Sequence, residues 1–216
     1  MRCSSIALKE IAKKFQRKWI FKDIDCTLNT NDVISITGNN GAGKSTLLKI
    51  ISGHLSPNKG TLSYFDSDNQ VIGRDDIYKH TTFAAPYINL MSRLNLVENI
   101  DFYCKFKNLQ PGLNKDTFID LIQLKQSAHK ELRFYSSGMQ QRVKLAFAIC
   151  ADSSVLILDE PTSNLDDEGA KWFTQTLQKY SSERIIIIAS NAQRDFDLCN
   201  RSLSILDYKK QKLQVK

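Results

Sequence analysis

The sequence GNNGAGKS, residues 38–45, is the stretch that decides the fold predicted for this chain. It follows the apolar alternation VISIT (33–37), which predicts a buried strand, and precedes TLLKII (46–51), which predicts a helix closed by Gly53. Glycines at this spacing let the backbone wrap closely around a phosphate and point successive N–H groups at its oxygens. The pattern therefore predicts a phosphate-binding loop between a strand and a helix.

Individual residues of this loop have separate expected roles. The helix that begins near Lys44 places the positive end of its dipole at the loop, which favours an anion. Lys44 is expected to reach the β- and γ-phosphates of ATP, and the Ser45 hydroxyl to ligate Mg²⁺. An ordinary glycine-rich turn is the alternative, but the flanking strand and helix disfavour it. The residues expected to bind the nucleotide are Gly38, Asn39, Asn40, Gly41, Ala42, Gly43, Lys44, Ser45 and Thr46.

Length and composition limit the architecture. A chain of 216 residues can bury one substantial core, with room for a small attached lobe. No apolar run approaches the roughly 20 residues that cross a bilayer, and the start contains no signal-peptide core. We therefore expect one cytoplasmic domain, residues 1–216. The five cysteines and three histidines show no metal-ligand spacing, so reduced, buried thiols are expected.

The net charge is +7, from 30 basic and 23 acidic residues. Such a charge would suit a polyanion or an anionic membrane surface, but it also suits ATP and solubility, and no nucleic acid partner is expected. Four lysines cluster at the C-terminus and are interpreted as a solvated tail: Lys209, Lys210, Lys212 and Lys216.

Hydrophobic patterns predict the remaining elements. Two antiparallel strands are expected at 6–8 and 24–28, with an aromatic, basic turn at 15–21 between them. Trp19 and Phe21 in this turn either contact the core or are exposed rings. Further strands are predicted at 61–65, 81–85, 185–189 and around 203–206, with a loop at 66–79. Helical patterns cover 94–124, 139–149 and 168–180. About 1–85 and 151–216 are assigned to the sheets, and about 90–150 to a helical lobe.

A second cluster of charged residues follows the apolar run VLIL at 155–158. The run predicts an interior parallel strand whose carboxyl end faces the phosphate loop. Asp159 is then placed to hold Mg²⁺ through water, and Glu160 to polarise an attacking water as a general base.

The stretch YSSGMQQR, residues 135–142, separates this chain from other phosphate-loop proteins. It resembles the LSGGQ-Q-x-R signature of ABC ATP-binding cassettes, and it stands after a helical pattern and before the Asp159 strand, as in that family. The resemblance extends to residues 38–45 as the Walker A loop, 155–160 as Walker B and 163–166 as the D-loop. Phe15 matches the aromatic residue that stacks on adenine.

The resemblance implies an α/β fold with a RecA-like parallel sheet, an N-terminal antiparallel β subdomain and an inserted α-helical subdomain. It also implies a head-to-tail dimer, with a homodimer favoured, in which ATP lies between one subunit's phosphate loop and the other's signature helix. Ser136 and Gly138 would bind the γ-phosphate from the opposite side.

Two positions depart from the family pattern. Pro86 or Tyr87 stands where a Q-loop glutamine is usual, and Asn191 stands where a switch histidine is usual. Asparagine can hydrogen-bond a phosphate or a water but cannot carry a proton at neutral pH. With Lys44, Asp159 and Glu160 retained, slow ATP hydrolysis is expected, with Asn191 among the catalytic residues.

The leading expectation is the ATPase subunit of a transporter, peripheral on the inner face of the cell membrane, that works with a separate integral membrane permease. Residues 87–106 match the family's groove for that partner, although core packing of the lobe accounts for part of this pattern. The compact form is similar to small exporter cassettes such as haem exporters. The alternatives are a soluble ABC-type ATPase that serves complex assembly, and a nucleotide-operated clamp with very slow hydrolysis.

Overall fold

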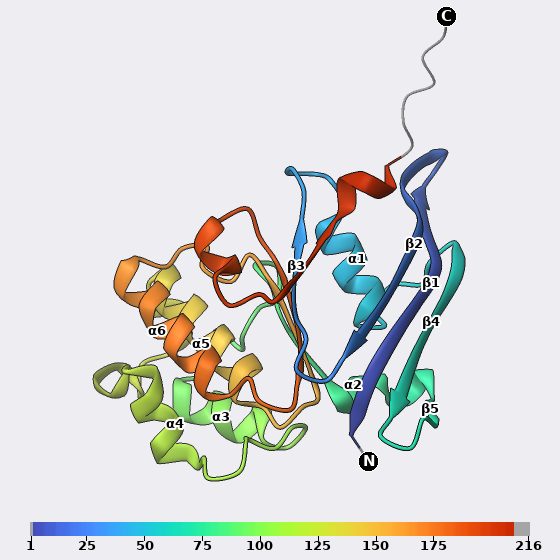
Figure 1. Ribbon diagram of the computed structural model, residues 1–216. Coiled ribbons are helices and arrows are strands. Elements are labelled where there is room, and N and C mark those ends of the chain that lie inside the picture. The colour runs from blue at the N-terminus through green and yellow to red at the C-terminus, as the bar shows by residue number, and fades with distance from the viewer. Residues whose placement is uncertain (1, 210–216) are drawn as a thin grey trace, which may run out of the picture.

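The computed structural model describes residues 2–209, and its strands form two sheets (Figure 1). One sheet is antiparallel, with strand order β2-β1-β4-β5, and the other is parallel, with order β6-β7-β8-β3-β9. The antiparallel strands are β1 (Cys3–Phe15), β2 (Lys18–Asn29), β4 (Lys59–Asp66) and β5 (Val71–Ile72). The parallel strands are β3 (Val33–Thr37), β6 (Thr81–Ala84), β7 (Val155–Asp159), β8 (Ile185–Ala189) and β9 (Arg201–Ser204).

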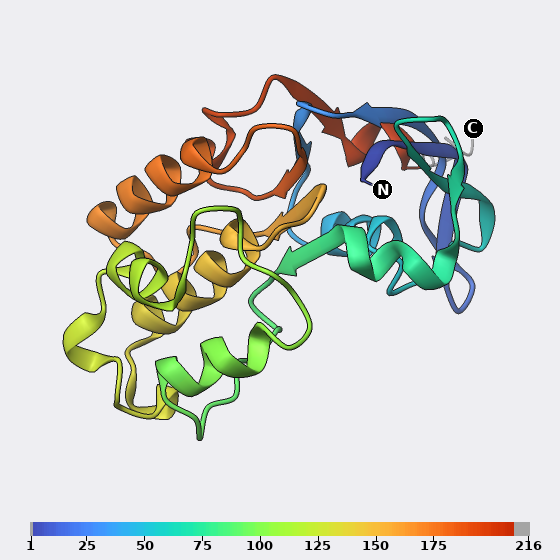
Figure 2. The same cartoon turned by 90° about the horizontal axis from the view of Figure 1, so that it is seen from below.

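Helices cover both faces of the parallel sheet. Figure 2 shows α3 to α6 gathered on the side away from the antiparallel sheet, whereas α1 lies between the two sheets (Figure 1). The helices are α1 (Lys44–Ile51), α2 (Ile77–His80), α3 (Leu96–Tyr103), α4 (Lys115–Ile122), α5 (Ser137–Cys150) and α6 (Asp167–Lys179). Side chains cap α3 to α6 at their N-termini, and the caps are Asn95, Asn114, Ser136 and Asp166.

The strands β7 and β8 are apolar throughout because both of their faces are buried. Leu156 and Ile186 pack into the core beneath α3 to α6. Their neighbours Ile157 and Ile187 point the other way, into the core formed with α1 and the antiparallel sheet. Since side chains alternate along a strand, two cores require a continuous apolar run. The strands predicted from the apolar runs at 155–158 and 185–189 are confirmed.

Four predicted segments differ from the structure. The stretch 94–124, predicted as helical, forms α3 and α4 with a non-helical segment at 104–114 between them. The stretch 66–79, predicted as a loop, contains β5 and the start of α2, because Ile72 and Ile77 reach the core and are each 6% exposed. The turn predicted at 15–21 comprises only residues 16–17, since Trp19 and Phe21 already belong to β2. The last strand is Arg201–Ser204, earlier than predicted, and a 3₁₀ turn follows it.

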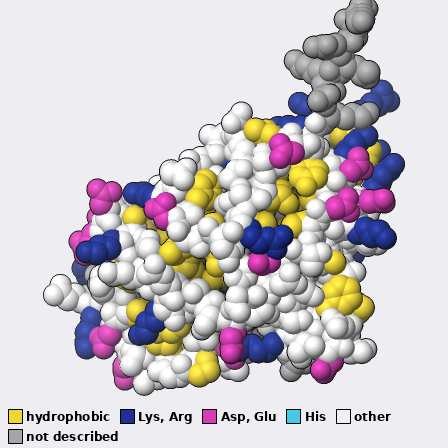
Figure 3. Space-filling view, in the orientation of Figure 1, with side chains coloured by type: hydrophobic (Ala, Val, Ile, Leu, Met, Phe, Trp, Pro, Cys, Tyr) yellow, Lys and Arg dark blue, Asp and Glu magenta, His cyan; other side chains and the backbone are white. Residues whose placement is uncertain are grey.

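The cysteines and the surface charges follow the sequence expectations in part. All five cysteines are free; Cys3 and Cys150 are buried as expected, whereas Cys104 is exposed. On the face shown in Figure 3, basic and acidic side chains are interspersed and form no single basic field. Of the C-terminal lysines, Lys209 is exposed, and Lys210, Lys212 and Lys216 lie outside the described residues.

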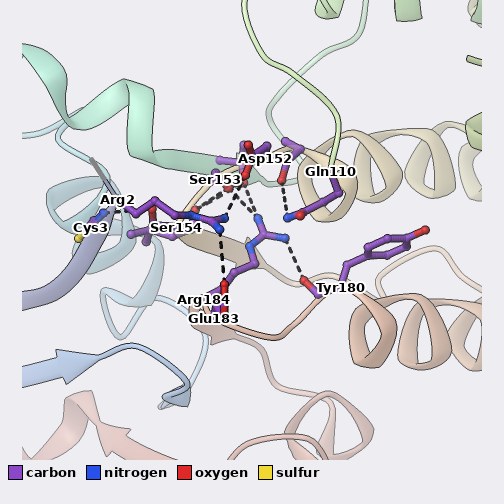
Figure 4. A network of polar contacts seen from close by, with 12 residues as sticks. Arg2, Cys3, Gln110, Asp152, Ser153, Ser154, Tyr180, Glu183 and Arg184 are labelled. Atoms are coloured by element: carbon purple, nitrogen blue, oxygen red, sulfur yellow. Dashed lines mark hydrogen bonds and ion pairs between the residues drawn. The ribbon is translucent and has the colours of Figure 1, made fainter. Parts of the chain in front are cut away.

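A buried arginine joins the C-terminal ends of α5 and α6 (Figure 4). Arg184 is 0% exposed, and one of its terminal nitrogens donates to the Ile149 carbonyl at 2.6 Å and to the Tyr180 carbonyl at 3.2 Å. The other donates to Ser153 Oγ at 2.7 Å. These carbonyls belong to the last turns of the helices, where they lack intrahelical partners and carry the negative end of the dipole. Burial lowers the pKa of Arg184 to about 10. Within residues 2–209 no carboxylate forms an ion pair with it, so the two helix ends stabilise its charge.

We expect Arg184→Ala to lower the free energy of unfolding by about 3 kcal/mol or more, because it leaves buried carbonyls without a donor and opens a cavity. Arg2→Ala is the matched control. Arg2 is half-exposed and pairs with Asp152 at 3.0 Å, so its loss should cost less than about 1 kcal/mol. Urea denaturation measures both variants, and equal losses would contradict the role assigned to Arg184.

Candidate nucleotide-binding site

The loop between β3 and α1 has the backbone that a phosphate site needs. Gly38, Gly41 and Gly43 have φ values of +144°, +71° and +110°, which disfavour residues with a Cβ. A Cβ on Gly43 would also lie 2.4 Å from Ile20 Cγ2, so the loop packs directly against β2. Beside it is an open cavity of about 360 Å³, lined by Ile20, residues 40–46 and Glu160. The predicted strand, loop and helix are therefore present.

The register of the parallel strands places the polar groups around this loop. Asp159 at the end of β7 lies opposite Ala189 of β8, which in turn lies opposite Ile36 of β3. The residues that follow, Glu160 and Asn191, therefore emerge at the same edge of the sheet as the loop. This is the edge at which ligands of open α/β sheets bind.

Lys44 is enclosed by acceptors from three segments. Its side chain is 6% exposed, and Nζ donates to the Gly38 carbonyl at 2.8 Å and to Asn191 Oδ1 at 2.8 Å. Glu160 Oε1 lies 3.8 Å from the same nitrogen. An ammonium held at the start of α1, beside backbone N–H groups, is suited to attract phosphate oxygens.

Glu160 adopts a left-handed backbone conformation, which is unfavourable for a residue with a side chain. Its φ is +49°, and its N–H donates to the Ala189 carbonyl at 2.7 Å. Its carboxylate accepts from Ser190 Oγ at 3.2 Å, from the Asn191 N–H at 3.3 Å and from Asn191 Nδ2 at 2.9 Å. Asn191 Nδ2 also donates to Asn40 of the loop. The Asn191 amide thus connects the phosphate loop, Lys44 and Glu160.

Asp159 and Ser45 offer oxygen donors that suit a magnesium ion. Asp159 is 2% exposed, and burial raises the pKa of its carboxyl, while hydrogen bonding by Ser45, the charge of Lys44 and the Tyr87 hydroxyl oppose that shift. A carboxylate beside a hydroxyl is the donor set that Mg²⁺ prefers. Of the two residues considered at the Q-loop position, Tyr87 is the one that faces Asp159.

Ser136 and Gly138 do not join this cluster. They line a separate open cavity of about 320 Å³ with residues 164–166, at the start of α5. Ser136 caps the helix by accepting from the Met139 N–H at 3.2 Å, and a Cβ on Gly138 would lie 3.0 Å from the Asn164 carbonyl. The signature stretch and the D-loop stretch are therefore packed together, away from Lys44.

Phe15 is 49% exposed at the end of β1, outside the lining of the 360 Å³ cavity. Its role with adenine stays a prediction. Phe21 is buried against Gly43, and Trp19 is partly buried, with Lys22 Nζ 4.4 Å from its ring centre.

The sequence did not identify two residues of the site. Ser190 Oγ donates to the side chain of Glu160, and Ser163 Oγ donates to the Glu160 carbonyl at 2.7 Å. The position of Ser190 directly after an apolar strand was the available signal, because parallel strands end at one edge. Nothing in the local sequence indicated the Ser163 contact.

The comparison with protein families agrees with this geometry. Residues 21–163 match the family model described as ABC transporter. The chain belongs to the ABC transporter family. Its fold is that of the ATP-binding cassettes of this family, and such cassettes bind nucleotide.

Curated relatives fall into two groups by length. The cassette is 27% identical over 202 residues to ATP-binding cassette sub-family A member 2 of Homo sapiens, a match that covers 92% of this chain but 8% of that protein. It is 30% identical over 181 residues to the cytochrome c biogenesis ATP-binding export protein CcmA of Rhizobium johnstonii, covering 81% of each. The chain thus spans a small part of the first group and most of the second.

Solved structures share the fold at low identity. A putative ABC transporter ATP-binding protein from Pyrococcus furiosus superposes with a TM-score of 0.79 at 20% identity, covering 96% of this chain and all of that one. The dimeric structure of the bacterial cassette MJ0796 gives 0.76 at 22% identity, covering 93% and 94%. Within residues 2–209 of the present cassette, no helix is long and apolar enough to cross a membrane.

Two glycines of the loop provide a matched test of its geometry. Gly43→Ala should weaken ADP binding strongly, because the new methyl group meets Ile20 and the positive φ is disfavoured as well. Gly41→Ala has open space around it, so only the backbone penalty of about 1–2 kcal/mol applies. Isothermal titration calorimetry should show at least about tenfold weaker binding for Gly43→Ala than for Gly41→Ala. Equal affinities would contradict the packing of β2 against the loop.

Proposed function

We propose that this chain is the ATP-hydrolysing subunit of an ABC transporter, working as a dimer with a separate membrane permease. The observation that carries the proposal is the separation of two half-sites. Lys44, Glu160 and Asn191 line one region, whereas Ser136 and Gly138 line another. Two copies in head-to-tail contact would bring one half-site from each chain onto a single ATP, with a homodimer as the simplest form.

The chain's own residues divide the work of hydrolysis in this proposal. The backbone N–H groups of residues 40–46 and the Lys44 ammonium bind the phosphates, and Ser45 with Asp159, the latter through water, would hold Mg²⁺. The ion supplies positive charge against the developing phosphate charge. Glu160, oriented by Ser190 and Asn191, accepts a proton from the attacking water. Ser136 and the N–H groups at Gly138 of the second subunit would bind the γ-phosphate from the other side. Phe15 remains the proposed adenine contact.

The hydrogen bonds of Asn191 are consistent with the proposal that this chain hydrolyses ATP slowly. Its Oδ1 accepts from Lys44, and its Nδ2 donates to Glu160 and Asn40, so the amide positions the site by hydrogen bonding. An amide does not gain or lose a proton near neutral pH. Proton transfer then depends on Glu160.

Glu160→Gln should lower the steady-state rate of ATP hydrolysis by about 10²-fold or more, because glutamine cannot accept the proton. Glu168→Gln, on the exposed first turn of α6, is the control and should leave the rate unchanged. A phosphate-release assay measures the rates. If the unmodified protein hydrolyses ATP no faster than Glu160→Gln does, the role of Glu160 as the general base is wrong.

The same variant tests the dimer. With ATP trapped between subunits, Glu160→Gln should elute as a dimer in saturating ATP and Mg²⁺ and as a monomer without nucleotide. A protein that stays monomeric under both conditions, even beside its membrane partner, rules out the shared site.

A membrane partner is supported by apolar exposure on the helical lobe. Tyr87, Met91, Phe102 and Phe106 are 45%, 50%, 38% and 72% exposed, at and around a groove between α3 and α5. Other apolar residues of this segment, such as Leu94 and Tyr103, are partly buried. Docking of a permease there would place the cassette peripherally on the inner face of the membrane.

Purification of the tagged protein from gently solubilised membranes separates this function from its alternatives. A stoichiometric integral membrane protein in the eluate is expected. Recovery only from the soluble fraction, with a soluble partner, would instead support an ATPase that serves complex assembly. Recovery without a partner and with negligible hydrolysis would support a nucleotide-operated clamp.

A further inference from the structure

A buried carboxyl group that the proposed hydrolysis does not use lies next to Ser190, the residue that donates to Glu160. Asp195 belongs to the 3₁₀ turn Gln193–Phe196 that follows β8, and it is 2% exposed. Both of its carboxyl oxygens are buried, and within residues 2–209 no group forms a hydrogen bond to either of them. An ionised carboxylate in such a place is strongly unfavourable, so the state of this side chain depends on the groups around it.

Two hydroxyls and two charged groups surround the Asp195 carboxyl. The hydroxyls of Ser190 and Thr162 lie close enough to favour its charged form, although neither is in hydrogen-bonding geometry with it. Burial raises the pKa of Asp195, and the negative charge of Glu160 acts in the same direction, whereas the two hydroxyls and the Arg194 guanidinium oppose the shift. The net effect favours the protonated, neutral acid.

The cation and the thiol nearest to this carboxyl do not neutralise it. Arg194 Nε donates to Thr162 Oγ1 at 3.1 Å, and its Nη1 lies 3.4 Å from Asp167. Within residues 2–209, Arg194 forms no ion pair with Asp195. Cys199 Sγ donates to the backbone carbonyl of Asp195 at 3.8 Å, and burial raises the pKa of this thiol to about 11, so it carries no charge near neutral pH.

The Ser190 hydroxyl connects the buried carboxyl to the general base. Ser190 Oγ accepts from the Ala192 N–H at 3.0 Å and donates to Glu160 Oε2 at 3.2 Å. Because a hydroxyl has one proton and two acceptor positions, Ser190 has room for one further donor but none for a further acceptor. An ionised Asp195 would compete with Glu160 for the proton of Ser190. A protonated Asp195 would instead donate to Ser190 Oγ and leave that proton on Glu160.

The Thr162 hydroxyl is available for the other oxygen of the same carboxyl. Thr162 Oγ1 accepts from Arg194, and among the hydrogen bonds of residues 2–209 its own proton has no acceptor. Thr162 can therefore donate to one oxygen of Asp195 while the protonated oxygen donates to Ser190. All donors then point along the chain in one direction, toward Glu160.

We propose that Asp195 is a protonated positioning residue, which donates to Ser190 Oγ and thereby directs the Ser190 proton to Glu160. This inference rests on the proposed role of Glu160 as the general base, and it adds the group that orients that base. Because the Asn191 amide does not titrate near neutral pH, Asp195 supplies a titratable group behind the catalytic carboxylate. Ionisation of Asp195 would draw the Ser190 proton away from Glu160 and slow hydrolysis.

The stability of the nucleotide-free protein tests the protonation. If the folded state holds a proton that the unfolded chain releases above about pH 4, the free energy of unfolding falls as the pH rises from there toward the folded-state pKa. Asp195→Asn has no such titration. Its urea midpoint relative to that of the unmodified protein should therefore rise between about pH 4 and about pH 7.

Asp197→Asn, which changes an exposed carboxylate at the end of the same turn, is the matched control and should show no such rise. If Asp195→Asn instead becomes less stable relative to the unmodified protein as the pH rises, the fold stabilises the ionised form of Asp195. That result would overturn the inference.

ATP hydrolysis tests the positioning. Asp195→Ala and Ser190→Ala should each lower kcat by roughly tenfold, because Glu160 loses an oriented donor. Asp195→Asn, which keeps a donor for Ser190 and an acceptor for Thr162, should recover most of the rate that Asp195→Ala loses. The kcat of the unmodified protein should fall at high pH as Asp195 ionises, and Asp195→Asn should remove that fall. A purely structural role would leave the pH profile unchanged, and Asp197→Asn should leave both rate and profile unchanged.

The outcomes separate this inference from the proposed function. If Asp195→Ala hydrolyses ATP as fast as the unmodified protein, or if Asp195→Asn keeps the fall at high pH, the inference is wrong and the ATPase function stands. Asp195→Asn preserves the side-chain volume, so its pH profile remains decisive if Asp195→Ala does not fold. If the unmodified protein hydrolyses ATP no faster than Glu160→Gln, the proposed function fails and the positioning of Glu160 fails with it.

Discussion

Hydrogen bonding among β3, β7 and β8 controls where every charged group of the nucleotide site lies. The register sets Asp159, Ala189 and Ile36 side by side, so the residues that follow each strand leave the sheet at one level. Lys44 begins the helix after β3, Glu160 follows β7 and Asn191 follows β8. A shift of one residue in any pair would turn side chains to the opposite face and separate these groups. The two apolar cores on either side of the sheet oppose such a shift.

Strand β8 lies between Arg184, which contacts the end of α5, and the residues that donate to Glu160. The strand begins next to Arg184, which donates to a carbonyl in the last turn of α5 and to the carbonyl of Tyr180, the residue that ends α6. It ends next to Ser190 and Asn191, which donate to the carboxylate of Glu160. Helix α5 carries Ser136 and Gly138 at its other end. The fully buried guanidinium therefore joins α5 to the strand whose following residues, Ser190 and Asn191, donate to Glu160.

The chain after β6 lies between the nucleotide site and the groove at α3 and α5. Tyr87 faces Asp159, its ring contacts Phe83 edge to face at 6.1 Å between centres, and Lys49 Nζ lies 4.2 Å from the ring centre. One residue earlier, the Pro86 carbonyl accepts from Lys144 in the groove. The segment after β6 therefore borders both Asp159 and the groove between α3 and α5.

The sequence alone determined the phosphate loop, the apolar strands and the carboxylates that follow them, because these depend on local spacing and on alternation of side chains. Glycines at 38, 41 and 43 and the run at 155–158 carry that information within a few residues. Short elements such as β5 and α2 were not predictable, since two buried isoleucines among polar residues produce no periodicity. The tertiary structure decided that Tyr87 faces Asp159, that the Asn191 amide joins Lys44 to Glu160, and that Lys144 of α5 donates to the Pro86 carbonyl beside the groove between α3 and α5. Each of these contacts joins segments far apart in the chain, and their geometry follows from strand register and helix packing, which no single stretch of residues specifies.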